Sequence, residues 1–336
     1  MSTPVPDEQR EVQQRLEAHA RRLGSSATVV VEGRAGEGDS QENWFFRLRT
    51  DGGVQHRVLR RNARSVASDS DRGREFEALR RLQGQGLPIP AVEWLDATGE
   101  SFGRPGFTME RCEGETDLMA LTPMNRFGWD EAARVALARR FTALMAQIHA
   151  IDWTRCGLGS VLGVPGASIA DVRMQAIVDE IERQRLEAYP EIEETLDWLR
   201  ARPPKPCTPV LTHGDFRVVQ ALLRRDGSIG ALLDWEFVRL SDPLEELAHF
   251  LMPPMQPVHS IPGAWEADDF IADYEAASGR RVDRADLHWW RVLNMLWVMG
   301  FMLQTLRGMV EQRVNAIRSH AFVSRLLGQL LALTRD

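Results

Sequence analysis

Two aspartates, each following a short apolar segment, are the residues of this sequence best suited to chemistry. Asp215 closes the run Leu211-Thr212-His213-Gly214-Asp215, and Asp234 follows Leu232-Leu233. The intervening Arg225-Asp226-Gly227-Ser228 predicts a hairpin turn, which can bring both acids to one end of two strands. Such a pair suits phosphoryl transfer, because one carboxylate can accept a proton from the nucleophile while the other holds Mg²⁺ against the phosphates. Either aspartate alone is explained as simply by a turn cap.

Length and composition bound the kind of protein that carries these acids. The 336 residues are enough for two lobes with separate cores, and 43% hydrophobic with 26% charged residues is typical of a globular protein. The net charge of -7 argues against a nucleic-acid partner, since phosphate binding needs clustered positive charge. Lys205 is the only lysine, so any site that needs a lysine must use a substitute.

The cysteines and the apolar segments indicate a cytoplasmic protein. Cys112, Cys156 and Cys207 have no metal-ligand spacing, and their odd number does not support a disulfide framework. Residues Met1 to Arg22 lack the apolar core of a secretory signal. The most apolar run, Val292 to Leu303, is about half as long as a membrane span requires. We therefore expect no membrane partner.

The first third of the chain predicts an antiparallel sheet with helices beside it. Residue alternation and turn signals divide this part into short elements. The expected helices are Asp7 to Leu23 and Asp71 to Gln83, and the expected strands are Ala27 to Glu32, Asn43 to Arg49, Val54 to Arg60, Val92 to Leu95 and Phe107 to Arg111. A polar, glycine-rich loop from Gly33 to Gln41 separates the first two strands.

From Trp129 onward the pattern is mainly helical. Helices are expected over Asp130 to Ile151, Ile169 to Ala188, Glu191 to Ala201, Asp268 to Ala277 and, with at least one break, Leu287 to Leu333. Three short strands are expected at Val210 to Thr212, Ala221 to Arg224 and Gly230 to Leu233. The Trp- and Met-rich stretch Trp289 to Met302 could line an acceptor pocket, but a packed core explains it more simply. The acidic run Glu191 to Glu194 could attract a cationic acceptor, but we expect an exposed helix face.

The segment around the two aspartates resembles the aminoglycoside phosphotransferase and choline kinase-like family. That family has a catalytic loop H-G-D-x-x-x-x-N and a metal aspartate in I/L-D-W, and one sub-group reads HGDFRxGN and LDWE followed by GDPxxDL. The matching segments here are His213-Gly214-Asp215-Phe216-Arg217, Leu233-Asp234-Trp235-Glu236 and Ser241-Asp242-Pro243-Leu244-Glu245-Glu246-Leu247.

The resemblance extends into the first third of the chain and covers residues 27 to 280 in the family's order. The matching segments are Ser40-Gln41-Glu42-Asn43-Trp44, Val58-Leu59-Arg60-Arg61, Arg74-Glu75, Gly86-Leu87-Pro88-Ile89-Pro90 and Phe107 to Gly114. The resemblance implies an α+β, protein-kinase-like two-lobed fold, with an antiparallel-sheet lobe over residues 1–111 that binds ATP. A mostly helical lobe over residues 112–336 would hold the catalytic loop and the acceptor site.

The resemblance also implies roles for individual residues. Asp215 would be the catalytic base and Asp234 the main Mg²⁺ ligand, with His213 and Asp242 supporting the catalytic loop through hydrogen bonds. Arg60 stands where kinases place the phosphate-binding lysine, although its planar guanidinium is not equivalent to an ammonium. The remaining implied nucleotide contacts are Ser40 in the glycine-rich loop, Glu75 as the partner of Arg60, and the backbone from Glu110 to Cys112 against adenine.

Two adjacent positions depart from the family's pattern. Gln220 replaces the metal-binding asparagine, and Val219 replaces the glycine before it. Glutamine offers the same carbonyl ligand on a longer arm, whereas two adjacent valines, Val218 and Val219, stiffen the loop. The implied function is ATP- and Mg²⁺-dependent transfer of a phosphoryl group to the hydroxyl of a small molecule. The alternative is a catalytically impaired relative that only binds nucleotide or a small molecule. The acceptor stays open, as does the choice between a monomer and a homodimer.

Overall fold

The chain folds into two units, which are described separately. The computed structural model describes residues 6–22, 27–35, 41–63, 71–166, 168–311 and 318–335. The first unit consists of Met1–Gly114 together with Ile229–Glu236, and the second of Glu115–Ser228 together with Phe237–Asp336. A short segment that contains Asp234 therefore belongs with the N-terminal part of the chain. The lobe boundary at residue 111 stays a prediction of the sequence.

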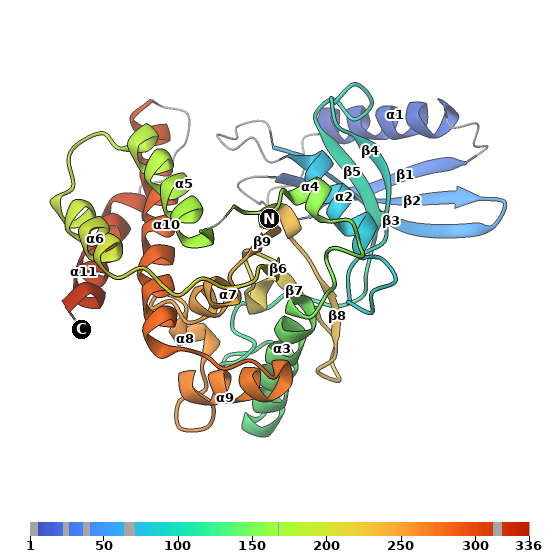
Figure 1. The fold of residues 1–336 in the computed structure, drawn as a ribbon. Helices are drawn as coiled ribbons and strands as arrows, with labels where there is room; N and C mark the ends of the chain where they lie inside the picture. Colours follow the sequence, from blue (N-terminus) through green and yellow to red (C-terminus); the bar gives the residue numbers. More distant parts are fainter. Residues whose placement is uncertain are drawn as a thin grey trace. The chain divides into compact units, whose positions relative to one another are not determined.

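The first unit contains a five-stranded antiparallel sheet in the order β1-β2-β3-β5-β4 (Figure 1). Strand β2 alternates buried and exposed positions as the sequence predicted, with Trp44, Phe46 and Leu48 buried. The elements before residue 114 are α1 (Pro6–Arg22), β1 (Thr28–Arg34), β2 (Gln41–Thr50), β3 (Gly53–Asn62), α2 (Arg72–Leu82), β4 (Val92–Asp96) and β5 (Gly106–Glu110).

Helix α1 packs against the sheet because its apolar side chains recur every four residues. Val12, Leu16 and Ala20 are buried in one cluster with residues of β1 and β2, including Trp44 and Phe46. Burial of this apolar stripe removes it from water and fixes the helix on the sheet.

Strand β3 and helix α2 place the first set of predicted site residues. Arg60 lies on β3, opposite Asn43 of β2 on one side and Phe107 of β5 on the other. Helix α2 begins after Asp71, whose side chain accepts a hydrogen bond from the Arg74 amide as an N-cap. Glu75 therefore lies in the first turn of α2.

The second unit is mainly helical, and α10 contacts α5, α6, α7 and α11 (Figure 1). Trp289, Trp290, Met295 and Met299 of α10 are buried, so packing explains most of the Trp- and Met-rich stretch. The helices are α3 (Glu131–His149), α4 (Gly159–Leu162), α5 (Ile169–Gln184), α6 (Pro190–Ala201), α7 (Pro243–Phe250), α8 (Gln256–His259), α9 (Ala267–Ser278), α10 (Arg284–Val310) and α11 (Arg318–Arg335).

Short strands and turns carry the two aspartates. Strand β6 (Val210–Thr212) pairs antiparallel with β9 (Arg239–Ser241) in the second unit. Strands β7 (Ala221–Leu223) and β8 (Ile229–Leu232) and the 3-10 turns Val218–Gln220 and Trp235–Phe237 complete this part of the chain. No helix in the described ranges is long and apolar enough to cross a membrane.

Candidate active site

The loop that follows β6 presents Asp215. Gly214 has a φ of 87°, and a Cβ there would lie 2.2 Å from the carbonyl oxygen of Phe237. Only glycine fits this left-handed and crowded position, which explains the residue before the aspartate. The Asp215 amide donates to Nδ1 of His213 at 3.3 Å, so His213 supports the loop as the sequence implied.

Three side chains hold the Asp215 carboxylate. Oδ2 accepts from Nη2 of Arg217 at 2.5 Å and from Nε2 of Gln220 at 2.6 Å. Oδ1 lies 3.1 Å from Nε2 of His249 on α7. The structure thus brings together Asp215 and Gln220, which the sequence singled out, and adds two cationic or hydrogen-bonding partners.

These partners keep Asp215 ionised. Burial alone would raise the pKa of this carboxyl, because desolvation disfavours the charged form. The hydrogen bond and charge of His249, followed by the charge of Arg217, outweigh burial and hold the pKa of Asp215 well below its ordinary value. An ionised carboxylate can only accept hydrogen bonds, which is the state that a base for a hydroxyl proton needs.

A buried network fixes the catalytic loop from behind. The Gly214 amide donates to Oε1 of Glu246 at 2.7 Å, and Oε2 of Glu246 lies 2.9 Å from Nε2 of His149. Nδ1 of His149 in turn lies 2.7 Å from the Tyr274 hydroxyl. The hydrogen bond to the loop that the sequence assigned to Asp242 is therefore made by Glu246. Asp242 instead caps α7, where its side chain accepts from the Leu244 amide.

Glu245 anchors α7, the helix that carries Glu246 and His249. Its Oε1 lies 2.8 Å from Nε of Arg173 on α5 and 2.7 Å from Nη2 of Arg239 on β9, and Oε2 accepts from the Ser241 hydroxyl. Burial would raise the pKa of Glu245, but the two guanidinium groups lower it from 4.5 to about 2. The folded protein therefore stabilises the ionised form of the Glu245 carboxylate.

Replacement of Glu245 by glutamine is expected to make stability less dependent on pH. The depressed pKa means that ionised Glu245 stabilises the fold above pH 4.5, and that this contribution is lost as pH falls toward 2. At pH 7 Glu245→Gln should lower the free energy of unfolding by about 3 kcal/mol, from the size of the shift. Urea unfolding at a series of pH values measures the gap between the two proteins, which should close toward pH 2.

A matched control is Glu193→Gln, which removes a half-exposed ion pair with Arg185. It should cost less than about 1 kcal/mol at any pH. A stability gap for Glu245→Gln that stays constant between pH 7 and pH 3 would contradict this account of Glu245.

A second charged cluster lies in the first unit, around Asp234. Nη2 of Arg60 lies 2.9 Å from Oε1 of Glu75 and 2.5 Å from Oδ1 of Asp234. Arg60 and Glu75 are almost fully buried, whereas the Asp234 side chain is 17% exposed. Nε2 of Gln41 also donates to Oδ1 of Asp234, at 3.4 Å. The structure therefore joins Arg60, Glu75 and Asp234, three residues that the sequence singled out.

The backbone at Asp234 is unusual. Its φ of 68° lies in the left-handed region, and among the described residues it is the one non-glycine position with a positive φ. Aspartate tolerates this conformation better than most residues, but it still stores strain that surrounding contacts must offset. Strain of this kind is concentrated at functional sites.

Glu236 adds a further carboxylate to the cluster. Its Oε2 lies 3.3 Å from Nη2 of Arg72, and Nη1 of the same arginine lies 2.6 Å from Oε2 of Glu75. Burial, together with the nearby charge of Asp234, raises the pKa of Glu236. Among the described contacts, three carboxylates, those of Glu75, Asp234 and Glu236, thus lie beside two guanidinium groups.

The other predicted nucleotide contacts are Ser40 and the backbone from Glu110 to Cys112, of which the structure describes the second. Ser40 lies outside the described residues. Glu110 ends β5, and its amide donates to the Ala91 carbonyl at 2.7 Å, while the next amide, that of Arg111, donates to the His56 carbonyl at 3.1 Å. Cys112 follows directly and is partly buried.

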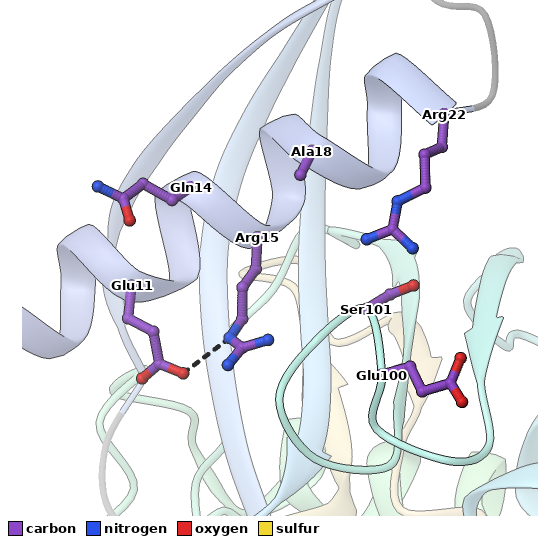
Figure 2. A pocket seen from close by; sticks show the side chains of 7 residues that line it. All are labelled: Glu11, Gln14, Arg15, Ala18, Arg22, Glu100 and Ser101. Atoms are coloured by element: carbon purple, nitrogen blue, oxygen red, sulfur yellow. Dashed lines mark hydrogen bonds and ion pairs between the residues drawn. The ribbon is translucent and has the colours of Figure 1, made fainter.

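A polar depression of about 250 Å³ on the first unit is distinct from these groups (Figure 2). Figure 2 shows Arg15 directed at Glu11, and their Nε and Oε1 atoms are 2.8 Å apart. The depression is lined by Glu11, Gln14, Arg15, Ala18 and Arg22 of α1 and by Glu100 and Ser101. None of the predicted site residues lines this depression, and its acids and bases balance.

Asp234 in the first unit offers a carboxylate oxygen, and Gln220 in the second unit offers a carboxamide oxygen; both are kinds of ligand that Mg²⁺ accepts. Mg²⁺ takes one or two protein oxygens and completes its shell with water and substrate phosphates. No cluster of three or more His, Cys, Asp or Glu side chains suited to a metal occurs in the part of the chain that the structure describes, so an all-protein cage is not offered there.

A family model and solved structures both match this chain to phosphotransferases. A model of the phosphotransferase enzyme family matches residues 34–292. A structure of a Ralstonia eutropha protein assigned as an aminoglycoside phosphotransferase superposes with a TM-score of 0.76 at 21% identity, over 96% of this chain and 97% of that one. Aminoglycoside phosphotransferase APH(4)-Ia, in complex with ADP and hygromycin B, superposes with a TM-score of 0.61 at 20% identity, over 95% and 97% of the two chains. These likenesses confirm the predicted α+β, protein-kinase-like fold.

Curated relatives are much longer than this chain. Acyl-CoA dehydrogenase family member 10 of Mus musculus is 26% identical over 231 residues, which cover 68% of this chain and 21% of that protein. Acyl-CoA dehydrogenase family member 11 of Homo sapiens is 25% identical over 179 residues, which cover 53% and 22%. The chain thus spans about a fifth of the length of these relatives.

Proposed function

The chain belongs to the phosphotransferase enzyme family, and from this membership we propose that it transfers the γ-phosphoryl group of ATP to the hydroxyl of a small molecule. The observation that carries the proposal is the Asp215 carboxylate, which is ionised and held by Arg217, Gln220 and His249. A carboxylate fixed in this way can accept a hydrogen bond from the acceptor hydroxyl and take its proton as the bond to phosphorus forms. Asp215 is the catalytic residue of the proposal.

The nucleotide is proposed to use residues of the first unit. Arg60, oriented by Glu75, would neutralise phosphate charge, and Ser40 and the backbone from Glu110 to Cys112 would complete the contacts to ATP. Support comes from the phosphotransferase APH(4)-Ia, whose structures contain ADP or the analogue AMP-PNP. In the proposal Asp234 and Gln220 hold Mg²⁺, which would supply positive charge against the transferred phosphoryl group.

Gln220 is expected to matter both for the metal and for Asp215. Its Nε2 donates to Asp215, which orients the carboxamide so that the oxygen is the end suited to a cation. Gln220→Ala should therefore raise the Mg²⁺ concentration needed for half-maximal turnover and lower kcat by roughly tenfold, as for a lost positioning contact. Titration of turnover with Mg²⁺ measures both effects.

Gln220→Asn is the informative comparison for this variant. It restores the family's residue, but the loop still carries Val218 and Val219, so no gain over the natural chain is expected. Strong turnover that is indifferent to Gln220→Ala would remove Gln220 from the metal site.

The acceptor is best identified by a direct screen. Aminoglycosides are suggested by the structural neighbours and acyl-CoA compounds by the names of the curated relatives, and an acyl-CoA acceptor would also need a hydroxyl. We propose to measure ATP consumption with aminoglycosides, amino alcohols, sugars and hydroxyacyl thioesters, each with the natural chain and with Asp215→Asn. Consumption that depends on both an acceptor and Asp215 supports transfer, and none with any acceptor argues against it.

A second candidate function is nucleotide binding without transfer. Two observations favour it: Gln220 replaces the usual asparagine, and Arg60 forms an ion pair with Asp234, the proposed metal ligand. Calorimetry of ATP binding with and without Mg²⁺, set beside the screen, separates the two functions. Tight Mg²⁺-dependent binding with no consumption of ATP would favour the second.

A further inference from the structure

The two oxygens of the Asp215 carboxylate are held unequally. A carboxylate has about four acceptor sites, two on each oxygen. Oδ2 accepts from both Arg217 and Gln220, which uses its two sites. Oδ1 has a single described partner, His249, so one of its sites is left for a further donor.

His249 is itself held in place for this contact. Only 4% of the residue is exposed, and Asp215 is 5% exposed. The imidazole packs edge-to-face on Trp297 of α10, with ring centroids 5.4 Å apart, and Trp297 packs in the same way on Phe237 and Phe301. Nε2 of His249 lies 3.1 Å from Oδ1, and as the donor in this contact it carries the ring hydrogen.

We propose that His249 is a positioning residue which directs Oδ1 of Asp215 toward the acceptor hydroxyl. Arg217 and Gln220 fix one oxygen, but the direction of the remaining site on Oδ1 depends on the hydrogen bond from the other side. That His249 orients the Asp215 carboxylate follows from contacts within the second unit alone. That this orientation serves phosphoryl transfer rests on the proposed function.

The test compares His249→Gln with His249→Leu. The glutamine amide can place a nitrogen near the position of Nε2 and keep the donor, whereas leucine fills similar space without one. His249→Leu should lower kcat by about 10- to 100-fold with little change in the KM for ATP, since a misplaced base slows only the chemical step. His249→Gln should recover most of that loss.

Crystal structures of the two variants test the role of His249 without any measurement of turnover. In crystals of His249→Leu the Asp215 carboxylate should rotate or occupy two orientations, whereas in His249→Gln it should keep the natural one. If the natural chain transfers phosphate to no acceptor, the proposed function fails, but the orientation of Asp215 still decides the role of His249.

Two further variants serve as a control and as a replacement for His249→Leu. His288→Leu is the matched control, because Nε2 of His288 also donates a hydrogen bond, to the Leu333 carbonyl, and the ring packs edge-to-face on a tryptophan, Trp198. It should leave kcat unchanged. If His249→Leu does not fold in a thermal unfolding assay, His249→Asn replaces it, since its amide is too short to reach Oδ1. An unchanged Asp215 in the variant without a donor, or equal losses with and without the donor, would overturn the proposal.

Discussion

Asp215→Asn is expected to lower turnover by roughly two to four orders of magnitude, the usual scale for loss of a general base. The amide has almost the shape of the carboxylate but cannot take the hydroxyl proton. Its NH₂ group would also face donors, because Arg217, Gln220 and His249 all approach this side chain. ATP affinity should change little, since Asp215 and these partners belong to the second unit, whereas the proposed ATP contacts belong to the first.

Steady-state kinetics with the best acceptor, together with calorimetry of ATP binding, measure the two effects separately. Asp226→Asn is a suitable control, because Asp226 is an exposed turn residue whose side chain accepts only from Ser228 in the described structure. A variant at Asp215 that retains half of the natural kcat would exclude this residue as the base.

Asp234→Ala is expected to abolish Mg²⁺-dependent binding of ATP. The substitution deletes the proposed metal carboxylate and leaves Glu75 as the ion-pair partner of Arg60 among the described contacts. Alanine at a φ of 68° adds backbone strain of about 1–2 kcal/mol. Calorimetry with ATP in the presence of Mg²⁺ or of a chelator measures the metal-dependent part of binding.

Asp234→Asn separates the metal from the backbone. Asparagine tolerates the left-handed conformation about as well as aspartate, so this variant should fold with nearly natural stability. It should nevertheless lose most of the Mg²⁺-dependent affinity, because a neutral amide is a poorer ligand than a carboxylate. Unchanged Mg²⁺-dependent binding in both variants would remove Asp234 from the metal site.

Elements with strong local patterns could be predicted from the sequence. Strand β2 alternates apolar and polar residues over ten positions, and α3 is long enough for its period to be clear. Helix α7 and strand β9 could not be predicted from the periodicity of apolar and polar residues. Strand β9 has three residues and α7 has eight, which are nearly all buried, so neither shows a polar face against an apolar one.

Some residues of the candidate site could likewise be predicted from the sequence, and one could not. Asp215, Asp234 and the Arg60–Glu75 pair were found because they stand in sequence patterns that resemble a known family. His249 escaped because its contact with Asp215 spans 34 residues and depends on how α7 packs. The available signal was the Glu245-Glu246 pair after Asp242-Pro243, which marks a capped helix start with His249 one turn further on.

The assignment of Ile229–Glu236 to the first unit has a consequence for how the chain is made. On the ribosome, residues up to Gly114 emerge long before Asp234, and the Leu232 amide that donates to the Pro88 carbonyl arrives equally late. Until then Arg60 and Arg72 share a single carboxylate, Glu75, of the three they contact in the finished fold. A nascent or truncated chain that stops at Gly114 would keep Glu75 beside these two arginines but would lack Asp234 and Glu236, and incompletely compensated buried charge is costly. We therefore expect the first unit to reach its final form only after residues 229–236 have been synthesised, and an expression fragment cut after residue 114 to lack two of the acids beside its buried arginines.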